Sequence, residues 1–178
     1  MFKSSKIVVF SILASMGATS AFAALPAVGD MAETEYSKVA YITVAGKAKR
    51  IEAVSSVGKV EIASFDSAKN EFTMKRTTTA AGASVSDTYT AAQNTVMSDA
   101  ELIDMLTDCA KQGGVAEKVT VPAGQFDACT VSRADDKDPN TVYKTSYSYV
   151  PFGIVYQETQ VSGKVTGISR LKSFKMQD

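Results

Sequence analysis

The chain has 178 residues, of which 45% are hydrophobic and 21% charged, a composition typical of one globular domain with its own core. Its 19 basic and 19 acidic side chains balance, so composition gives no polybasic field of the kind that binds nucleic acid or anionic lipid. The sequence has no histidine, the side chain that most often serves as a general base or zinc ligand near neutral pH. These counts disfavour nucleic-acid binders and histidine-dependent enzymes.

The N-terminal segment has the pattern of a signal peptide that is cleaved on export. Lys3 and Lys6 precede a short apolar run from Ile7 to Leu13, and Ala21-Phe22-Ala23 is a small-x-small site for signal peptidase. The alternative is a transmembrane anchor, but the apolar run is well short of the roughly 18 residues that a span needs. We therefore expect a signal peptide of residues 1–23, a periplasmic or secreted protein, and no membrane span after processing.

After a short lead-in, apolar and polar residues alternate along most of the chain, which is typical of strands with one buried face. Phe72 and Met74 share one face of their strand, and Val85, Tyr89 and Ala91 share one face of the next. The expected strands are residues 36–46, 49–58, 59–66, 71–79, 83–93, 117–121, 126–133, 141–150, 154–162 and 165–174.

One segment, residues 98–114, changes to a helical period. Ser98 and Glu101 have the spacing of a capping box, and Gly113-Gly114 provides a left-handed stop. Spacings of three and four predict one apolar stripe. That stripe consists of Leu102, Ile103, Leu106, Cys109 and Ala110.

The succession of many short strands and a single helix excludes a doubly wound parallel sheet, because the crossover helices are lacking. An antiparallel sheet that curves over the helix satisfies both periodicities. We expect one domain, residues 24–178, of the α+β class and mostly β. Its architecture would be a half-barrel or open barrel, with a curved antiparallel sheet wrapped on one central helix.

Cys109 and Cys129 are the only cysteines of the chain. A zinc site needs four ligands at close spacings, and the sequence has neither a histidine nor a second cysteine pair. Redox pairs are usually Cys-x-x-Cys at a helix N-terminus, whereas Cys109 lies near the end of the expected helix. In an exported chain two cysteines most often pair, so we predict a disulfide between the helix and the strand at residues 126–133.

The same region resembles a group of exported bacterial proteins. The shared patterns are V-x-V-P-A-G-x-F-x-x-C, which ends at Cys129, and P-F-G-x-V-x-x-E, at residues 151–158. The resemblance covers residues 106–174 and implies a fold similar to the LolA and LolB lipoprotein carriers, whose curved sheet cradles helices around an apolar cavity. This sequence departs from the group by having no tryptophan, and from the carriers by having no extra helices that could form a lid.

No catalytic motif stands out. The sequence lacks a Gly-x-Ser-x-Gly elbow, a phosphate loop and a dinucleotide fingerprint. Asp127 and Glu158 are single carboxylates on expected strands. Asp136, Asp138 and Asn140 have the first spacings of a calcium loop, but the later positions depart from it, and a solvated hairpin loop is favoured. We predict a non-enzymatic protein with no metal and no cofactor.

Tyrosines at every second position could line a ligand groove, with flat apolar faces and polar tips, or could cover the edge of the core. Together with two leucines of the helix stripe they form the candidate cavity lining. The candidate residues are Leu102, Leu106, Tyr143, Tyr147 and Tyr149.

Three functions remain open from the sequence. The first is a non-catalytic exported protein that holds an apolar or lipid-like small molecule in its half-barrel. The second is an envelope structural or protein-interaction module with a filled core and an unknown protein partner. The third is a hydrolase of an unrecognised type.

Overall fold

The computed structural model describes residues 26–177, so the expected signal peptide at residues 1–23 lies outside the described residues. Nine strands and one α-helix, α1 (Asp99–Thr107), occur within this range, with a short 3-10 turn, η1 (Gln93–Thr95), before the helix. The strands are β1 (Met31–Val44), β2 (Lys47–Asp66), β3 (Glu71–Ala80), β4 (Ala83–Ala92), β5 (Gly114–Val121), β6 (Gly124–Ala134), β7 (Thr141–Tyr147), β8 (Ile154–Val161) and β9 (Lys164–Lys175).

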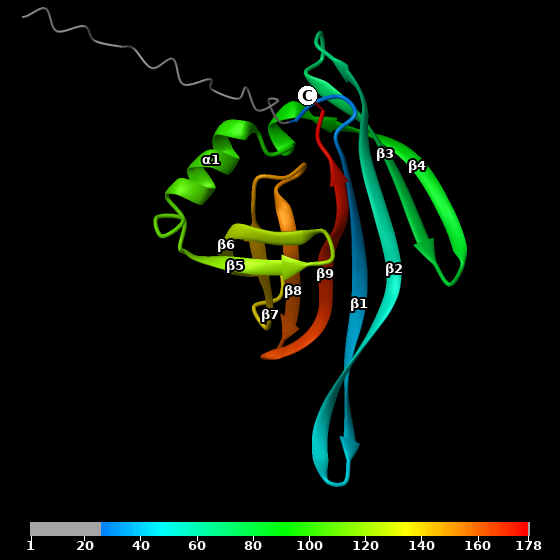
Figure 1. Ribbon diagram of the computed structural model, residues 1–178, viewed down its shortest axis with the longest axis vertical. Helices are drawn as coiled ribbons and strands as arrows, with labels where there is room; N and C mark the ends of the chain where they lie inside the picture. The colour runs from blue at the N-terminus through cyan, green and yellow to red at the C-terminus, as the bar shows by residue number, and fades with distance from the viewer. Residues whose placement is uncertain (1–25, 178) are drawn as a thin grey trace, which may run out of the picture.

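All nine strands form one antiparallel sheet with the order β4-β3-β2-β1-β9-β8-β7-β6-β5. Strands that are consecutive in sequence pair within β1–β4 and within β5–β9, and the pairing of β1 with β9 joins these two halves. The sheet is curved and open, with β4 and β5 as its edges (Figure 1). The predicted mostly β fold with a curved antiparallel sheet is therefore confirmed.

The β5–β9 half curls so far that β5 and β6 cross over β8 and β9 (Figure 1). The backbone N–H of Ala123, in the turn between β5 and β6, donates a hydrogen bond of 3.1 Å to the carbonyl oxygen of Leu171 on β9. A core cluster fills the space between the crossed layers. Its buried members are Ala32, Val121, Ala128, Val150, Val155 and Leu171.

The helix differs from its prediction in place and length. Its main contacts are with β6 and β7, at one end of the sheet, so the expected wrapping of the sheet around a central helix is not observed. The capping box of Ser98 and Glu101 is present, but α1 ends at Thr107, because the segment from Asp108 to Gly113 forms turns instead.

The buried face of α1 is also rotated from the predicted stripe. Leu102, Met105 and Cys109 are buried, whereas Ile103 is 51% exposed and Ala110 is exposed. This happens because the helix docks through positions three and four residues apart that start at Leu102, and Ile103 then points to solvent.

Two strand predictions are corrected as well. Residues 47–66 form the single strand β2, although two strands were expected there. Gly58, the apparent boundary, pairs with Thr34 on one side and Thr78 on the other, so it is an interior position of the sheet. The first strand was expected to begin at Tyr36, after the lead-in, but β1 already begins at Met31.

Candidate ligand groove

A groove of about 610 Å³, open to solvent, lies between the inner face of β1–β4 and the segment that connects β7 to β8. Its lining comes from β1, β2, β3, β4 and η1 on one side and from residues 147–157 and β9 on the other. The lining contains aliphatic, aromatic and small hydroxyl side chains, and none of its residues is Asp, Glu, Lys or Arg. Such a surface suits the uncharged, apolar part of a ligand.

The strand wall is held by a cluster in which Ile62, Phe72, Met74 and Val96 are buried. Met74 pairs with Ile62 on β2 and with Tyr89 on β4, so alternation places these three side chains on one face. Phe72 and Met74 are 3% and 2% exposed. The predicted shared face of these two residues is therefore confirmed.

The opposite wall is the turn at residues 148–153. Phe152 has a φ of 64°, which is unusual for a bulky residue, and its side chain packs against both the β1–β4 cluster and the main core. Gly153 has a φ of 76°, and a Cβ there would lie only 2.7 Å from Cδ2 of Leu102. Glycine is required at this position because of both its backbone conformation and its contact with the helix.

Two hydrogen bonds fix this turn to the surrounding elements. The phenol of Tyr149 donates to the carboxylate of Asp99 in the first turn of α1. Burial and the bond to Asp99 raise the pKa of Tyr149 to about 12, so the phenol stays protonated at neutral pH. The hydroxyl of Ser148 donates to the carbonyl oxygen of Asp127 on β6 at 2.8 Å.

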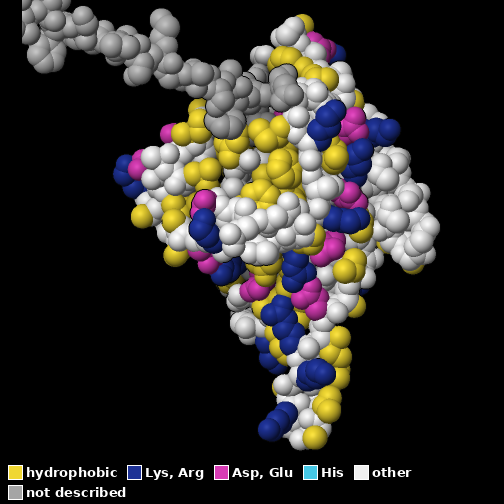
Figure 2. All heavy atoms as spheres, in the orientation of Figure 1, with side chains coloured by type: hydrophobic (Ala, Val, Ile, Leu, Met, Phe, Trp, Pro, Cys, Tyr) yellow, Lys and Arg dark blue, Asp and Glu magenta, His cyan; other side chains and the backbone are white. Residues whose placement is uncertain are grey.

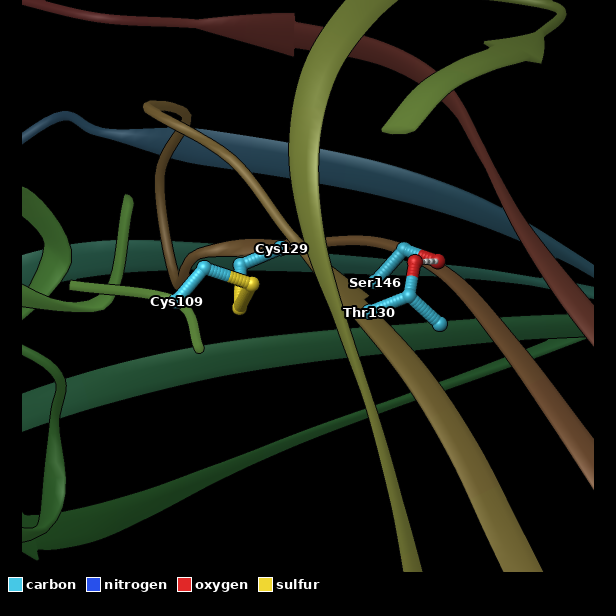
Figure 3. Close-up of a disulfide and its surroundings, with 4 residues drawn as sticks. All are labelled: Cys109, Cys129, Thr130 and Ser146. Atoms are coloured by element: carbon cyan, nitrogen blue, oxygen red, sulfur yellow. Dashed lines mark hydrogen bonds between the residues drawn. A yellow bond between two sulfur atoms is a disulfide. The ribbon is translucent and has the colours of Figure 1, made fainter. Parts of the chain in front are cut away.

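Cys109 and Cys129 form the predicted disulfide, with Cα atoms 5.5 Å apart (Figure 3). It joins the turn after α1 to β6, and both residues are buried. Beside it, the hydroxyls of Thr130 and Ser146 form a buried hydrogen bond of 2.8 Å between β6 and β7 (Figure 3). The bond satisfies both hydroxyls, so β6 and β7 pack beside the disulfide without leaving either of these buried groups unpaired.

The five candidate lining residues do not gather at one place. Tyr147 lines the groove. Leu102 is fully buried against Gly153, and Leu106 lines a separate hollow of about 400 Å³ beside β5 and β6. Tyr149 bonds to the helix, and Tyr143 lies near the loop between β6 and β7, where a hydrogen bond to Asp135 raises its pKa.

Most of the groove lining was not singled out from the sequence. Met74, Tyr89 and Ala91 had been placed on strand faces by their alternation, but nothing local indicated that this face stays open. Phe152 lies in the P-F-G motif, which carried only a fold assignment. The groove depends on the pairing of β1 with β9, which brings together segments that are distant in the sequence.

The carboxylates considered for catalysis occupy structural positions. Asp127 forms an exposed ion pair of 2.7 Å with Lys118 on the neighbouring strand. Glu158 accepts a hydrogen bond of 3.0 Å from Tyr156, and burial together with Glu158 raises the pKa of Tyr156 to about 12. Asp138 accepts from the backbone N–H of Asn140 and from a neighbouring hydroxyl, as in a hairpin loop.

Two kinds of feature are absent from residues 26–177. No group of three or more cysteine or acidic side chains in this range is arranged to hold a metal ion. In the same range, no helix has the length and apolar character needed to cross a membrane.

Comparisons with known proteins find similarity to solved structures alone. No family model and no curated protein matches the chain. A solved structure from Bacteroides fragilis, described as an exported protein with a YmcC-like fold, is similar with 11% identity and a TM-score of 0.48, over 84% of this chain and 97% of that one. A structure described as a lipoprotein, from Parabacteroides distasonis, has 12% identity and a TM-score of 0.46, over 84% and 96% of the two chains.

Proposed function

We propose that the protein is an exported, non-catalytic binder that holds an apolar or lipid-like small molecule in the groove between β1–β4 and the β7–β8 turn. The observation that carries the proposal is the groove itself, whose volume of about 610 Å³ is lined by uncharged side chains. Ligand sites commonly have volumes of roughly 300–1,000 Å³ and mostly apolar walls with a few polar groups. Gln157 and Ser169 supply such polar groups in an otherwise largely apolar lining.

The backbone at Phe152 supports the same proposal. Its left-handed φ costs free energy, and strained residues cluster at ligand sites, where the surrounding structure holds them in place. The adjacent Gly153, pressed against Leu102, keeps the turn close to α1. The Phe152 side chain is thus presented to the groove by a rigid support and would not need to be ordered when a ligand enters.

The other two functions are less well supported. An open apolar groove exposes apolar surface to water, which is unfavourable unless a ligand or another surface covers it. Such a groove therefore fits poorly with an envelope module whose core is filled. A hydrolase would need activated groups, and the two carboxylates considered for it are engaged with Lys118 and Tyr156. We therefore keep ligand binding as the leading function.

Filling the groove should abolish binding. Ala91 lines the groove from the edge strand β4, and its neighbour Thr90 is exposed on the opposite face of the same strand. We expect Ala91→Trp to lose the binding of a neutral apolar dye such as N-phenyl-1-naphthylamine, because the ring takes the ligand's place. Thr90→Trp should bind the dye like the wild type.

Dye fluorescence titrations and melting curves of the three proteins would test this. Equal dye binding by both tryptophan variants, or a wild type that binds no dye and carries no lipid, would contradict the proposal. The second point is checked by native mass spectrometry of protein purified from its own host.

A further inference from the structure

The hairpin of β1 and β2 extends far beyond the rest of the sheet. Pairing of β1 with β9 ends at Lys38, and pairing of β2 with β3 begins only at Val57. Beyond Lys38 the two strands pair only with each other, and residues 38–54, here called the ribbon, form a projection at one end of the molecule (Figure 1). At ~3.4 Å per residue, its strands reach roughly 20 Å from the sheet.

The ribbon is rich in exposed apolar side chains. Of the thirteen large hydrophobic residues that are exposed among residues 26–177, five lie on it. These are Tyr41, Ile42, Val44, Ile51 and Val54, with exposed fractions between 40% and 59%. A lone hairpin is marginally stable, and an apolar patch that is concentrated on one is typical of a surface that becomes covered.

One face of the ribbon combines these apolar groups with positive charge. Directly paired residues share a face of an antiparallel ribbon. The pairs on this face, here called the lysine face, are Lys38 with Ala53, Ala40 with Ile51, Ile42 with Lys49, and Val44 with Lys47. The lysine face has no acidic residue, and among residues 26–177 its three lysines form no ion pair. Figure 2 shows dark-blue and yellow side chains together along the projection.

The opposite face does not have this character. Arg50 lies 3.7 Å from the carboxylate of Glu52, which also receives two hydrogen bonds from Arg170 on β9. These bonds lower the pKa of Glu52, which is thus ionised and balances positive charge near the base of the ribbon. The unbalanced positive charge is therefore confined to the lysine face.

We propose that the lysine face of the ribbon docks on an anionic phospholipid surface, with Ile42, Val44 and Ile51 at the boundary between headgroups and acyl chains. Charge complementarity favours this occupant, since uncompensated lysines alternate with aliphatic side chains over a narrow strip. A bilayer boundary offers phosphates and hydrocarbon at the matching separation of a few ångströms. A soluble polyanion would use the lysines but not the aliphatic groups. This inference is independent of the groove and its ligand.

The test is co-sedimentation of the exported protein with vesicles of phosphatidylcholine and phosphatidylglycerol, compared with vesicles of phosphatidylcholine alone. The wild type should bind only the anionic vesicles, and added salt should weaken binding. The double variant Lys47→Gln with Lys49→Gln should bind roughly 30-fold more weakly, the product of two lysine contributions. Lys164→Gln with Lys175→Gln, two exposed lysines of β9, is the matched control and should bind like the wild type.

The apolar contribution is measured separately. Ile42→Ser with Val44→Ser should also lose vesicle binding, although its charge is unchanged. Because the chain has no tryptophan, Val44→Trp provides a single tryptophan, which can be excited apart from the tyrosines. Its fluorescence should shift to the blue and be quenched by brominated lipid when anionic vesicles are added.

Four results would each overturn the proposal. They are equal binding to neutral vesicles, no binding to anionic ones, full binding by the serine variant, and a wild-type dimer in light scattering that the lysine variant abolishes. The third would indicate a polyanion partner, and the fourth a second copy of the chain. Melting curves of all variants check that the exposed substitutions leave the fold intact.

Discussion

Removing the disulfide by Cys109→Ala with Cys129→Ala should lower the free energy of unfolding by about 3 kcal/mol, in the chain-entropy account of cross-links. The bond closes a loop with a sequence separation of 20, and its loss gives the unfolded chain more conformations. For a domain of this size, the melting midpoint should fall by roughly 6–12 °C. Urea denaturation followed by circular dichroism measures the change, and a reducing agent should shift the wild type similarly.

Gly114 provides a second test of the disulfide, because it lies against both sulfur atoms. A Cβ at this position would lie 2.6 Å from the sulfur of Cys129 and 2.8 Å from that of Cys109, so Gly114→Ala should destabilise the wild type. In the background without cysteines the two sulfurs are absent, and the same change should cost clearly less. A double-mutant cycle isolates this coupling. Additive effects, or two reactive thiols in the natively folded protein, would contradict the disulfide assignment.

Strand faces could be predicted from the sequence because they depend on a local rule. Phe72 and Met74 are buried on one face of β3, as alternation indicated, and the β3–β4 pairing places Tyr89 beside Met74. The disulfide could be predicted for a different reason: the spacing and surroundings of Cys109 and Cys129 disfavoured a metal or redox site, and two cysteines in an exported chain most often pair.

Which face of the helix is buried could not be predicted from local rules. Period and composition allow Ile103 and Met105 equally as buried positions, because both are apolar and lie near Leu102. Docking on β6 and β7 selects Met105 and leaves Ile103 exposed. The groove depends even more on tertiary structure, since its two walls come from opposite halves of the sheet. Of the five residues proposed from sequence to line a cavity, only Tyr147 is among those that line the groove.

Overall charge concealed the lysine face in the same way. The chain as a whole is neutral, and composition gave no reason to expect binding to an anionic surface. The register of β1 and β2 brings Lys47 and Lys49 beside Ile42 and Val44 on one strip. Such a concentration becomes visible only when the pairing is known, because the contributing residues lie on two strands.

Leu102→Ala should lower the free energy of unfolding by about 2–5 kcal/mol, because the side chain is fully buried and its removal opens a void beside Gly153. The adjacent Ile103→Ala is the matched control. Ile103 is 51% exposed on the same helix, so this change should stay within about 0.5 kcal/mol of the wild type apart from helix propensity.

The same pair of variants separates packing from cavity lining on α1. If Leu102 faced a ligand cavity, as the sequence suggested, its truncation would remove few packing contacts and cost little more than that of Ile103. Burial against the β7–β8 turn implies the larger cost in free energy of unfolding, and it implies that Leu102 is energetically coupled to that turn.

Gly153→Ala would place a Cβ against Cδ2 of Leu102, so it should destabilise the wild type strongly. Leu102→Ala should relieve part of this cost, and the remainder reflects the φ of 76° and the contact with Met97. Urea unfolding of the wild type, the three single variants and the double variant Leu102→Ala with Gly153→Ala gives these free energies. Equal costs for Leu102→Ala and Ile103→Ala would show that the helix lines a cavity after all.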